Sequence, residues 1–447
     1  MPRIASHVTR AAAALWLAAL SVSPAAAAIT PWRTALADRA AAPSGTEHIV
    51  HAFDAATRDG SHSTALPLLL GSSAFLTTQN GGLNSDFGVG GYGTVVELSR
   101  TGFAWPERVI YDFKSGDDGA NPAGGVIADR AGNLYGTASL GGLGFPNGGT
   151  VFELSRDGSG WKETTLHEFG LTAGDGAYPQ GALLEDAAGD FFGTTPYGGG
   201  GSLCNYGCGT LFELEPVDGG RTYREVILHR FTGGNDGAYP VAALIADSTG
   251  ALYGTASSGG PYGQGVIFKV LPPADKRPWE FYAIRYLTGG SDGGTPTCTL
   301  ARASNGVLFG TTSSGGHGAE GGSGGYGVVF SLTPEASSPV RYEYRVLHAF
   351  TAGNDGLDPL AGVTIGKGGI LYGTTGSNPG GNLGTVYELV PPAYQHYVLY
   401  TSTVGVDGLS GLDGGVAIDQ AGNLIGAAVH GPGIGQAGFV FDVVPKQ

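Results

Sequence analysis

A phrase of four residues recurs along nearly the whole chain, with 53 to 63 positions between the glycines of successive copies. It consists of two apolar residues, a glycine, and a threonine or alanine. A period in this range is typical of repeat architectures, in which each unit buries its apolar face against its neighbours. The phrase therefore constrains the fold more than any other feature of the sequence. Its copies are Leu134-Tyr135-Gly136-Thr137, Phe191-Phe192-Gly193-Thr194, Leu252-Tyr253-Gly254-Thr255, Leu308-Phe309-Gly310-Thr311, Leu371-Tyr372-Gly373-Thr374 and Leu424-Ile425-Gly426-Ala427.

A second phrase, a glycine followed by an apolar run rich in β-branched residues, raises the number of units to seven. The extra unit lies at the amino-terminal end, where Phe75-Leu76-Thr77-Thr78 is a degenerate copy of the first phrase. Atypical terminal copies are expected in repeat proteins. The second phrase begins at Gly93, Gly149, Gly209, Gly265, Gly327, Gly384 and Gly438.

Each unit is predicted to contain four short strands. Glycine accounts for 82 of the 447 residues, against a usual share of about 7%, and dense glycine between short apolar runs favours many tight turns between strands. Seven four-stranded units predict an all-β, seven-bladed β-propeller over residues 47–447. The array opens with a lone fourth strand at 48–53 and closes on a third strand at 439–444, so the N-terminal strand is expected to close the ring.

These units also resemble a known family. Gly132-Asn133-Leu134-Tyr135-Gly136-Thr137, followed by Gly149-Thr150-Val151-Phe152, is similar to the tandem GloVer-type repeats of exported bacterial proteins. The resemblance covers roughly residues 48–444 and implies a propeller-like fold. It supplies no catalytic residues. Many members are similar in carrying a C-terminal surface anchor, and no such segment follows Val444 before the chain ends at Gln447.

The first 28 residues have the pattern of a secretory signal peptide. Arg3 and Arg10 precede an uncharged, mostly apolar stretch at 11–22, and the alanines at 25–28 provide a small-residue cleavage site. The alternative is an ordinary N-terminal core helix. The apolar run is shorter than the roughly 20 residues that span a bilayer. We therefore expect a secreted or periplasmic protein without a membrane span, with residues 29–46 as a flexible lead-in to the propeller.

Charge and cysteines limit the partners. The formal net charge of −15 argues against nucleic acid and anionic membranes as partners, because both repel an acidic surface. It permits cation binding. Cys204 and Cys208 lie in one glycine-rich loop and are predicted to form a local disulfide, while Cys298 is expected to be a small buried residue.

An Asp-Gly pair recurs in the connection between successive units. Aspartate and glycine form turns, so these pairs are structural on the simplest interpretation. The alternative is a ring of carboxylates around the channel mouth that holds a hard cation such as Ca²⁺ through oxygen ligands. The candidate metal ligands are Asp118, Asp175, Asp236, Asp292, Asp355 and Asp407.

Residues that the scaffold does not require are better candidates for function, because binding residues concentrate on loops. Tyr178, Tyr197, Tyr206 and Tyr239 lie on loops of one presumed face and are candidate ligand-binding residues, whose rings would stack on sugars. Each also has a simpler interpretation as a turn residue. His51, His167, His229 and His348 recur at one strand position, which indicates packing.

Two functions remain open from the sequence. The first is a non-enzymatic exported propeller that binds a glycan or a protein partner, such as a surface protein, on its loop-rich face. The alternative is a metal-assisted lyase or hydrolase that acts on a polysaccharide or another extracellular substrate, with His62, His317 and His430 as candidate catalytic residues. An enzyme requires two or more such groups within hydrogen-bond or metal-ligand reach.

Overall fold

The structure is a computed structural model, and it describes twelve stretches of the chain between residues 47 and 445. The chain divides into two units, Met1–Ala42 and Pro43–Gln447, and every described residue belongs to the second. The predicted signal peptide and lead-in, residues 1–46, therefore lie outside the described residues. The described ranges are 47–53, 59–83, 91–102, 104–143, 147–172, 174–220, 222–273, 278–317, 324–376, 384–402, 412–429 and 437–445.

The second unit is a seven-bladed β-propeller, as the repeat predicts. Each blade is one antiparallel sheet of four strands, and the blades are numbered here in chain order. The strands are β2 (Leu68–Leu70), β3 (Ser73–Thr78), β4 (Thr94–Ser99) and β5 (Glu107–Asp112) in blade 1; β6 (Ile127–Ala128), β7 (Leu134–Ala138), β8 (Thr150–Asp157) and β9 (Gly160–Glu168) in blade 2; β11 (Leu184–Glu185), β12 (Phe191–Thr195), β14 (Thr210–Val217) and β15 (Thr222–Arg230) in blade 3; β16 (Ile245–Ala246), β17 (Leu252–Ala256), β18 (Val266–Leu271) and β19 (Glu280–Tyr286) in blade 4; β20 (Ala301–Arg302), β21 (Leu308–Thr312), β22 (Val328–Pro334) and β23 (Tyr342–Ala349) in blade 5; β24 (Thr364–Ile365), β25 (Leu371–Thr374), β26 (Thr385–Val390) and β27 (Gln395–Thr401) in blade 6; and β28 (Val416–Ile418), β29 (Leu424–Ala428), β30 (Phe439–Val443) and β1 (Glu47–Ala52) in blade 7.

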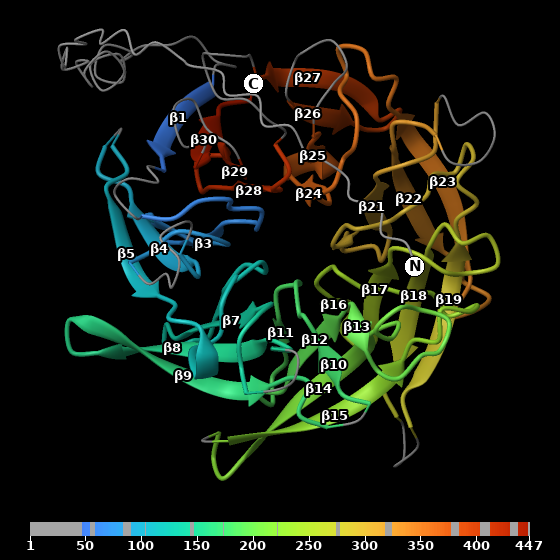
Figure 1. The fold of residues 1–447 in the computed structure, drawn as a ribbon. Coiled ribbons are helices and arrows are strands. Elements are labelled where there is room, and N and C mark those ends of the chain that lie inside the picture. The colour runs from blue at the N-terminus through green and yellow to red at the C-terminus, as the bar shows by residue number, and fades with distance from the viewer. Residues whose placement is uncertain are drawn as a thin grey trace, which may run out of the picture. The chain divides into compact units, whose positions relative to one another are not determined.

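The blades stand around a common centre, with the short first strand of each blade innermost and the fourth outermost (Figure 1). Besides the blades, β10 (Gly176–Ala177) and β13 (Tyr197–Gly198) form a two-stranded ribbon, and η1 (Gly116–Asp118) and η2 (Lys367–Gly369) are single 3₁₀ turns. No helix in the described part of the chain is long and apolar enough to cross a membrane.

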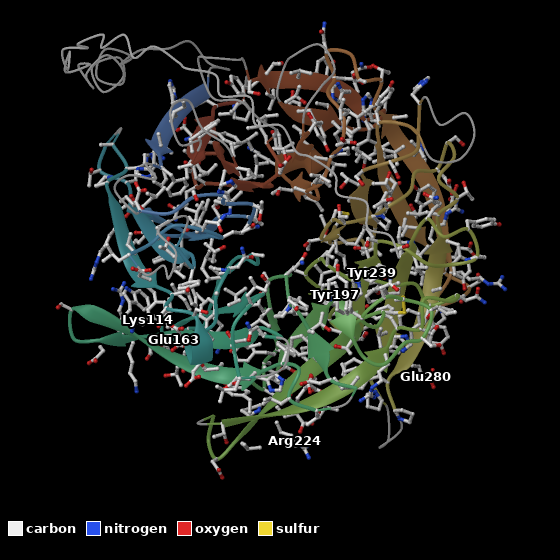
Figure 2. All side chains as sticks on the ribbon, viewed as in Figure 1. Lys114, Glu163, Tyr197, Arg224, Tyr239 and Glu280 are labelled. Atoms are coloured by element: carbon white, nitrogen blue, oxygen red, sulfur yellow. A yellow bond between two sulfur atoms is a disulfide. The ribbon has the colours of Figure 1, made fainter. Side chains whose placement is uncertain are left out.

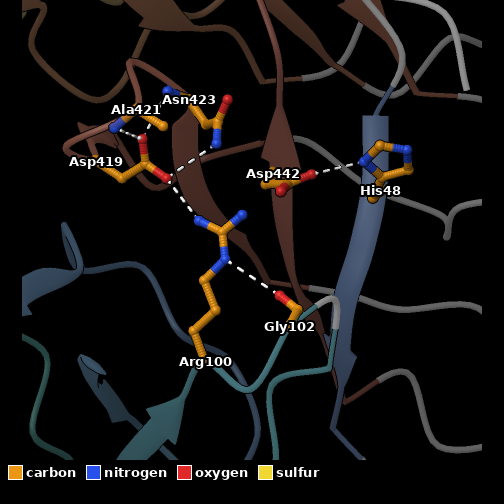
Figure 3. Close-up of polar contacts among 7 residues, drawn as sticks. All are labelled: His48, Arg100, Gly102, Asp419, Ala421, Asn423 and Asp442. Atoms are coloured by element: carbon orange, nitrogen blue, oxygen red, sulfur yellow. Dashed lines mark hydrogen bonds and ion pairs between the residues drawn. The ribbon is translucent and has the colours of Figure 1, made fainter. Parts of the chain in front are cut away.

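The N-terminal strand closes the ring, as predicted. β1 pairs antiparallel with β30 from Glu47↔Val443 to Ala52↔Phe439, so it is the fourth strand of blade 7. His48 Nδ1 lies 3.0 Å from Asp442 Oδ1, which ties the two strands through side chains (Figure 3). Arg100 of blade 1 donates to Asp419 of blade 7 at 2.9 Å, so the junction between the last and first blades is also joined by an ion pair.

The glycine of the recurring phrase is required by an aromatic ring on the neighbouring strand. Gly136 pairs with Phe152 across β7 and β8, and a Cβ on this glycine would meet Phe152 Cζ at 2.6 Å. Gly193, Gly254, Gly310, Gly373 and Gly426 face Phe212, Phe268, Phe330, Tyr387 and Phe441 in the same way. The degenerate first copy lies one residue earlier than predicted, at 74–77. Leu76 takes the place of the glycine there and pairs with Val96, which takes the place of the aromatic residue, and both side chains are fully buried.

The threonine of the phrase joins each blade to the next. Its hydroxyl donates to a backbone carbonyl that leads into the innermost strand of the following blade, at 2.8 to 3.0 Å. Buried polar groups need such partners, so this bond both satisfies a carbonyl and sets the spacing between blades. The pairs are Thr77 with Gly124, Thr137 with Gly181, Thr194 with Ala242, Thr255 with Cys298, Thr311 with Ala361, and Thr374 with Gly414.

Each junction between blades also has its own apolar core. Phe75 and Val95 of blade 1 pack with Leu134 and Phe152 of blade 2, for example, and the other junctions repeat this arrangement. The blades are therefore held mainly by side chains that cross from one repeat to the next.

The predicted disulfide joins Cys204 to Cys208, and Cys298 is free and buried, as expected.

The threonine bond predicts the effect of a substitution that keeps the side chain's shape. Thr194→Val should lower the free energy of unfolding by roughly 1–3 kcal/mol, because the buried Ala242 carbonyl loses its donor. Urea denaturation would measure this loss. Thr172→Val is the matched control, since Thr172 is exposed and should change stability by less than about 0.5 kcal/mol. Equal losses in the two variants would show that the hydroxyl does not join the blades.

Candidate functional site

One repeated position holds residues in a strained backbone conformation. It lies three residues after the Asp-Gly aspartate in six blades, and its φ angle is between 51° and 61° in every one. Twelve non-glycine residues have positive φ in the described part of the chain, and half of them occupy this position. All six are half-buried. We call them the mouth ring: His62, Asn121, Tyr178, Tyr239, Thr295 and Asp358.

Backbone hydrogen bonds to two blades fix this conformation. Tyr239 N–H donates to the Cys208 carbonyl of the preceding blade at 2.9 Å. Its own carbonyl accepts from the Ser257 amide at 3.2 Å and from Ser257 Oγ at 3.0 Å. Thr295 is held in the same manner between the Gln264 carbonyl and Ser313. The ring residues are therefore fixed in place by the contact between blades.

The cost of this conformation suggests that the side chains have a purpose. A left-handed conformation costs an L-residue about 1–2 kcal/mol, and it is least compatible with bulky or β-branched residues such as Tyr178 and Thr295. Glycine would remove the cost, and this chain places glycine at most of its other positive-φ positions. Strain that is retained tends to lie at functional sites.

The mouth ring lies where ligands bind to propellers. Each member lies six residues before the innermost strand of its blade, in the connection that enters the blade from the preceding one. Figure 2 places Tyr197 and Tyr239 close together, toward the centre of the ring from the outer strands. The six members thus offer an imidazole, an amide, a hydroxyl, a carboxylate and two phenols at equivalent positions of successive blades.

Three of the four predicted ligand-binding tyrosines meet at this opening. The centroid of the Tyr197 ring lies 5.6 Å from that of Tyr178 and 5.5 Å from that of Tyr239, with steep angles between the planes. We call these three the tyrosine cluster. Tyr197 lies on the β10–β13 ribbon, paired with Ala177. The cluster therefore combines two neighbouring members of the mouth ring with a residue from a loop between strands.

Tyr206 is placed differently. Its side chain is 87% exposed, inside the loop that the Cys204–Cys208 disulfide closes. Its carbonyl accepts from the Gly198 amide at 2.8 Å, so the loop is attached to the β10–β13 ribbon. Tyr206 is thus available to a partner on the same face, without contacting the tyrosine cluster in the described structure.

The opposite side of the opening is acidic. Burial and the charge of Asp413 raise the pKa of Asp358 above its usual value. Both side chains approach Gly376 closely, since a Cβ built on Gly376 would lie 3.4 Å from Asp413 Oδ1 and 3.5 Å from Asp358 Cβ. The mouth therefore has an aromatic side at blades 3 and 4 and an acidic side at blades 6 and 7.

The described Asp-Gly aspartates make hydrogen bonds within their own turns. Their carboxylates turn back toward the outermost strand of their own blade and accept hydrogen bonds there. Asp236 accepts from Thr232 N at 2.9 Å and lies 3.0 Å from His229 Nε2. Burial works against its charge, but the hydrogen bonds from His229 and Thr232 lower the pKa of Asp236 overall. These hydrogen bonds agree with the turn role that the simplest interpretation of the sequence gave to the Asp-Gly pairs.

The other aspartates repeat this arrangement with different partners. Asp355 contacts His348 and Thr351, and Asp292 contacts Arg285 and Thr288. Asp118 accepts from Tyr111 and Lys114, and Asp175 accepts from Gly170 and Gly176. Asp407 lies outside the described residues. The predicted turn role is thus visible at five of the six candidates.

The three candidate catalytic histidines are not brought together among the described residues. His62 belongs to the mouth ring, and its Nδ1 lies 3.0 Å from Ser61 Oγ. His317 is exposed on a loop of blade 5, close enough to His348 of the outermost strand to affect its pKa. His430 lies outside the described residues.

Three members of the mouth ring were not singled out from the sequence. They are Asn121, Thr295 and Asp358, although each stands between an Asp-Gly-X segment and a proline.

Residues 40–223 match the model of the Gloeobacter/Verrucomicrobia repeat. This match agrees with the family resemblance noted in the sequence, and together with the seven blades it places the chain among repeat-built β-propellers. No sequence of a curated protein matches this chain.

Several solved structures are similar in fold at low identity. A protein of unknown function from Dyadobacter fermentans is 12% identical, with a TM-score of 0.42, over 90% of this chain and 97% of that one. The Trypanosoma rangeli sialidase is 14% identical, with a TM-score of 0.41, over 86% of this chain and 54% of that one. TolB from Acinetobacter baumannii is 10% identical, with a TM-score of 0.38, over 68% of this chain and 58% of that one.

The strain in the mouth ring can be measured. Asp358→Gly should raise the free energy of unfolding by about 1 kcal/mol, because it removes the left-handed Cβ and a carboxylate next to Asp413. Ala123→Gly, in a comparable loop without positive φ, should instead lower it by roughly 0.5–1 kcal/mol. Chemical denaturation of both variants makes the comparison. A loss in Asp358→Gly as large as that in Ala123→Gly would mean that the ring is unstrained.

Proposed function

We propose that this propeller of the Gloeobacter/Verrucomicrobia repeat binds a glycan at the mouth ring, as a non-enzymatic exported protein. The observation that supports this proposal is the mouth ring itself. Six side chains that can form hydrogen bonds are retained in a backbone conformation that glycine would adopt without strain. A scaffold that needed only a turn at this position would not require them.

The chemistry of the mouth suits a sugar. Binding sites combine apolar and aromatic surface with a few placed polar groups. The tyrosine cluster offers the flat faces of phenol rings, and tyrosine presents an apolar body with a polar tip. Asn121, Thr295 and Asp358 offer donors and acceptors for hydroxyl groups. The net charge of −15 and the acidic side of the mouth favour neutral or amino sugars over polyanions.

Binding is preferred to catalysis on geometric grounds. A metal-assisted lyase or hydrolase needs its acid, base or metal ligands to converge on one reacting atom. In the described residues, His62 and His317 share no hydrogen bond, and neither belongs to a group of three ligand residues. A protein partner is the second candidate for binding, because Leu203 and Tyr206 are exposed on the same face.

The binding proposal can be tested with a glycan array, followed by calorimetry on the sugars that bind. Tyr197→Ala should weaken affinity about tenfold or more, which corresponds to roughly 1.4 kcal/mol of lost contact with the sugar face. Tyr262→Ala is the matched control, because Tyr262 is exposed on a loop of the next blade and outside the mouth ring. Melting curves would confirm that both variants fold. No glycan binding, or equal weakening in both variants, would contradict the proposal.

Export is proposed from the pattern of residues 1–28 and from the Cys204–Cys208 disulfide, since disulfides persist in oxidising compartments. Expression of the full chain in a Gram-negative host, with fractionation and N-terminal sequencing, tests this. The mature protein should begin near Ile29 and appear in the periplasm or the medium. An uncleaved chain in the cytoplasm would contradict it, and Arg3→Glu with Arg10→Glu should reduce export because the positive n-region is lost.

A further inference from the structure

The outer edge of each blade junction brings three side chains together. The first comes from the fourth strand, the second is the Asp-Gly aspartate that follows it, and the third comes from the fourth strand of the next blade. We call such a group a junction triad. The described triads are His51–Asp59–Glu107, Tyr111–Asp118–Glu163, His167–Asp175–Glu225, His229–Asp236–Phe281, Arg285–Asp292–Tyr344 and His348–Asp355–His396.

Two of these triads contain a histidine, an aspartate and a glutamate. In each, one ligand atom from every residue lies within 4.8 Å of the other two. Imidazole nitrogen and carboxylate oxygen are ligands of first-row divalent cations. The two triads occur at the junction of blades 7 and 1 and at that of blades 2 and 3. They differ in the distance between histidine and glutamate, which is 3.9 Å from His167 Nε2 to Glu225 Oε2 and 3.1 Å from His51 Nε2 to Glu107 Oε2.

His167 and Glu225 face one another without a hydrogen bond. His167 Nε2 lies 3.9 Å from Glu225 Oε2, and both His167 Nε2 and Glu225 Oε1 are buried without a hydrogen-bond partner among the described residues. The His167 ring packs edge-on against Phe169, with 4.6 Å between centroids, which fixes its orientation. A buried polar atom without a partner costs stability, so such an atom in a native structure requires an explanation.

Asp175 is held with its carboxylate directed at the same point. Its Oδ2 accepts from the Gly170 amide at 2.8 Å, and its Oδ1 accepts from the Gly176 amide at 2.7 Å. These bonds leave lone pairs on both oxygens, since a carboxylate offers about four acceptor sites. Hydrogen bonds of this kind, which a metal ligand makes to other groups of the protein, orient the ligand in known metal sites. Asp175 is thus preorganised beside two side chains that each have one buried atom without a hydrogen-bond partner among the described residues.

We propose that His167, Asp175 and Glu225 form a binding site for a first-row divalent cation such as Zn²⁺ at the junction of blades 2 and 3. Three protein ligands leave a fourth position of a tetrahedral ion for water. All three side chains retain some solvent exposure, so an ion can enter from the rim. The mixed nitrogen and oxygen ligands favour Zn²⁺ over Ca²⁺, which prefers six to eight oxygens.

The protonation states of this triad agree with metal binding. Burial lowers the pKa of His167, so its imidazole is neutral near pH 7 and has a lone pair to donate. Burial and the charge of Asp175 raise the pKa of Glu225 to about 8. A divalent cation would replace the proton on Glu225 and compensate both carboxylates.

The triad at the junction of blades 7 and 1 holds a proton instead. His51 Nε2 lies 3.1 Å from Glu107 Oε2. Burial opposes the charged form, but the carboxylates of Asp59 and Glu107 raise the pKa of His51 to about 9. His51 Nε2 and Glu107 Oε1 are nevertheless buried without a hydrogen-bond partner among the described residues. This triad therefore serves as a comparison that has the same residue types and a closer pairing of histidine with glutamate.

A third triad provides a matched negative control. At the junction of blades 3 and 4, Phe281 occupies the position of the glutamate and stacks on His229 at 4.1 Å between centroids. His229 Nε2 is paired with Asp236 at 3.0 Å. Phenylalanine cannot ligate a cation, so His229 marks the same repeat position without the proposed chemistry.

The experiment is a calorimetric titration of the metal-depleted full chain with Zn²⁺ at neutral pH. The parent should bind one Zn²⁺ per chain, and Glu225→Gln and His167→Ala should each lose that binding. His229→Ala and His51→Ala should keep it. Co²⁺ substitution gives a second readout, because tetrahedral Co²⁺ absorbs strongly in the visible range, and the His167→Ala variant should lack this band.

Folding is checked in the same series. Melting in the presence of a chelator should give Glu225→Gln a temperature no lower than that of the parent, since the substitution removes an uncompensated buried carboxyl. Zn²⁺ should raise the melting temperature of the parent and leave that of Glu225→Gln unchanged. No Zn²⁺ binding by the parent, or binding that survives both Glu225→Gln and His167→Ala, would overturn the proposal. Equal loss in His229→Ala would also overturn it.

Discussion

A threonine hydroxyl crosses from the second strand of one blade to a carbonyl at the start of the first strand of the next, in six junctions of the described structure. This bond lies near the centre of the ring, where neighbouring blades approach most closely. In blades 2 to 7, the glycine next to this position makes room within the blade for the aromatic ring of the third strand, which lies over it. The blade spacing, the apolar junction cores and the position of the connecting loops all depend on this pair of residues.

The remaining junction shows how the ring tolerates exceptions. Blade 7 carries Ala427 in place of the threonine, so this junction lacks the hydroxyl. It is joined instead by the pairing of β1 with β30 and by the ion pair between Arg100 and Asp419. Blade 1 replaces glycine and phenylalanine together, by Leu76 and Val96. Both exceptions preserve contact across the junction while changing its chemistry, which is the behaviour expected of terminal repeats.

A rigid junction separates two regions that are open to variation. Near the centre, the mouth ring is fixed by hydrogen bonds from both neighbouring blades, so a strained residue can present its side chain without loosening the loop. At the outer edge, the aspartates accept hydrogen bonds from backbone amides of their own turns. The side chains that flank them differ from junction to junction. A histidine meets a glutamate, a phenylalanine or a second histidine there, which gives each junction different chemistry. The proposed glycan site therefore lies near the centre of the propeller, and the proposed cation site lies at its outer edge.

The sequence by itself determined the number of blades, the four strands in each and the closure by residues 48–53, because these follow from spacing and from alternating apolar residues. It also predicted that Tyr178, Tyr197 and Tyr239 lie on loops of one face and that Cys204 and Cys208 form a local disulfide, since loop position and residue type suffice for those predictions. It did not reveal that Asp175 and Asp236 turn toward the rim, because the direction of a side chain depends on which backbone amides it satisfies. The mouth ring and the triad of His167, Asp175 and Glu225 could be recognised only in the tertiary structure, since φ angles and contacts between different blades cannot be deduced from the spacing of residues along the sequence.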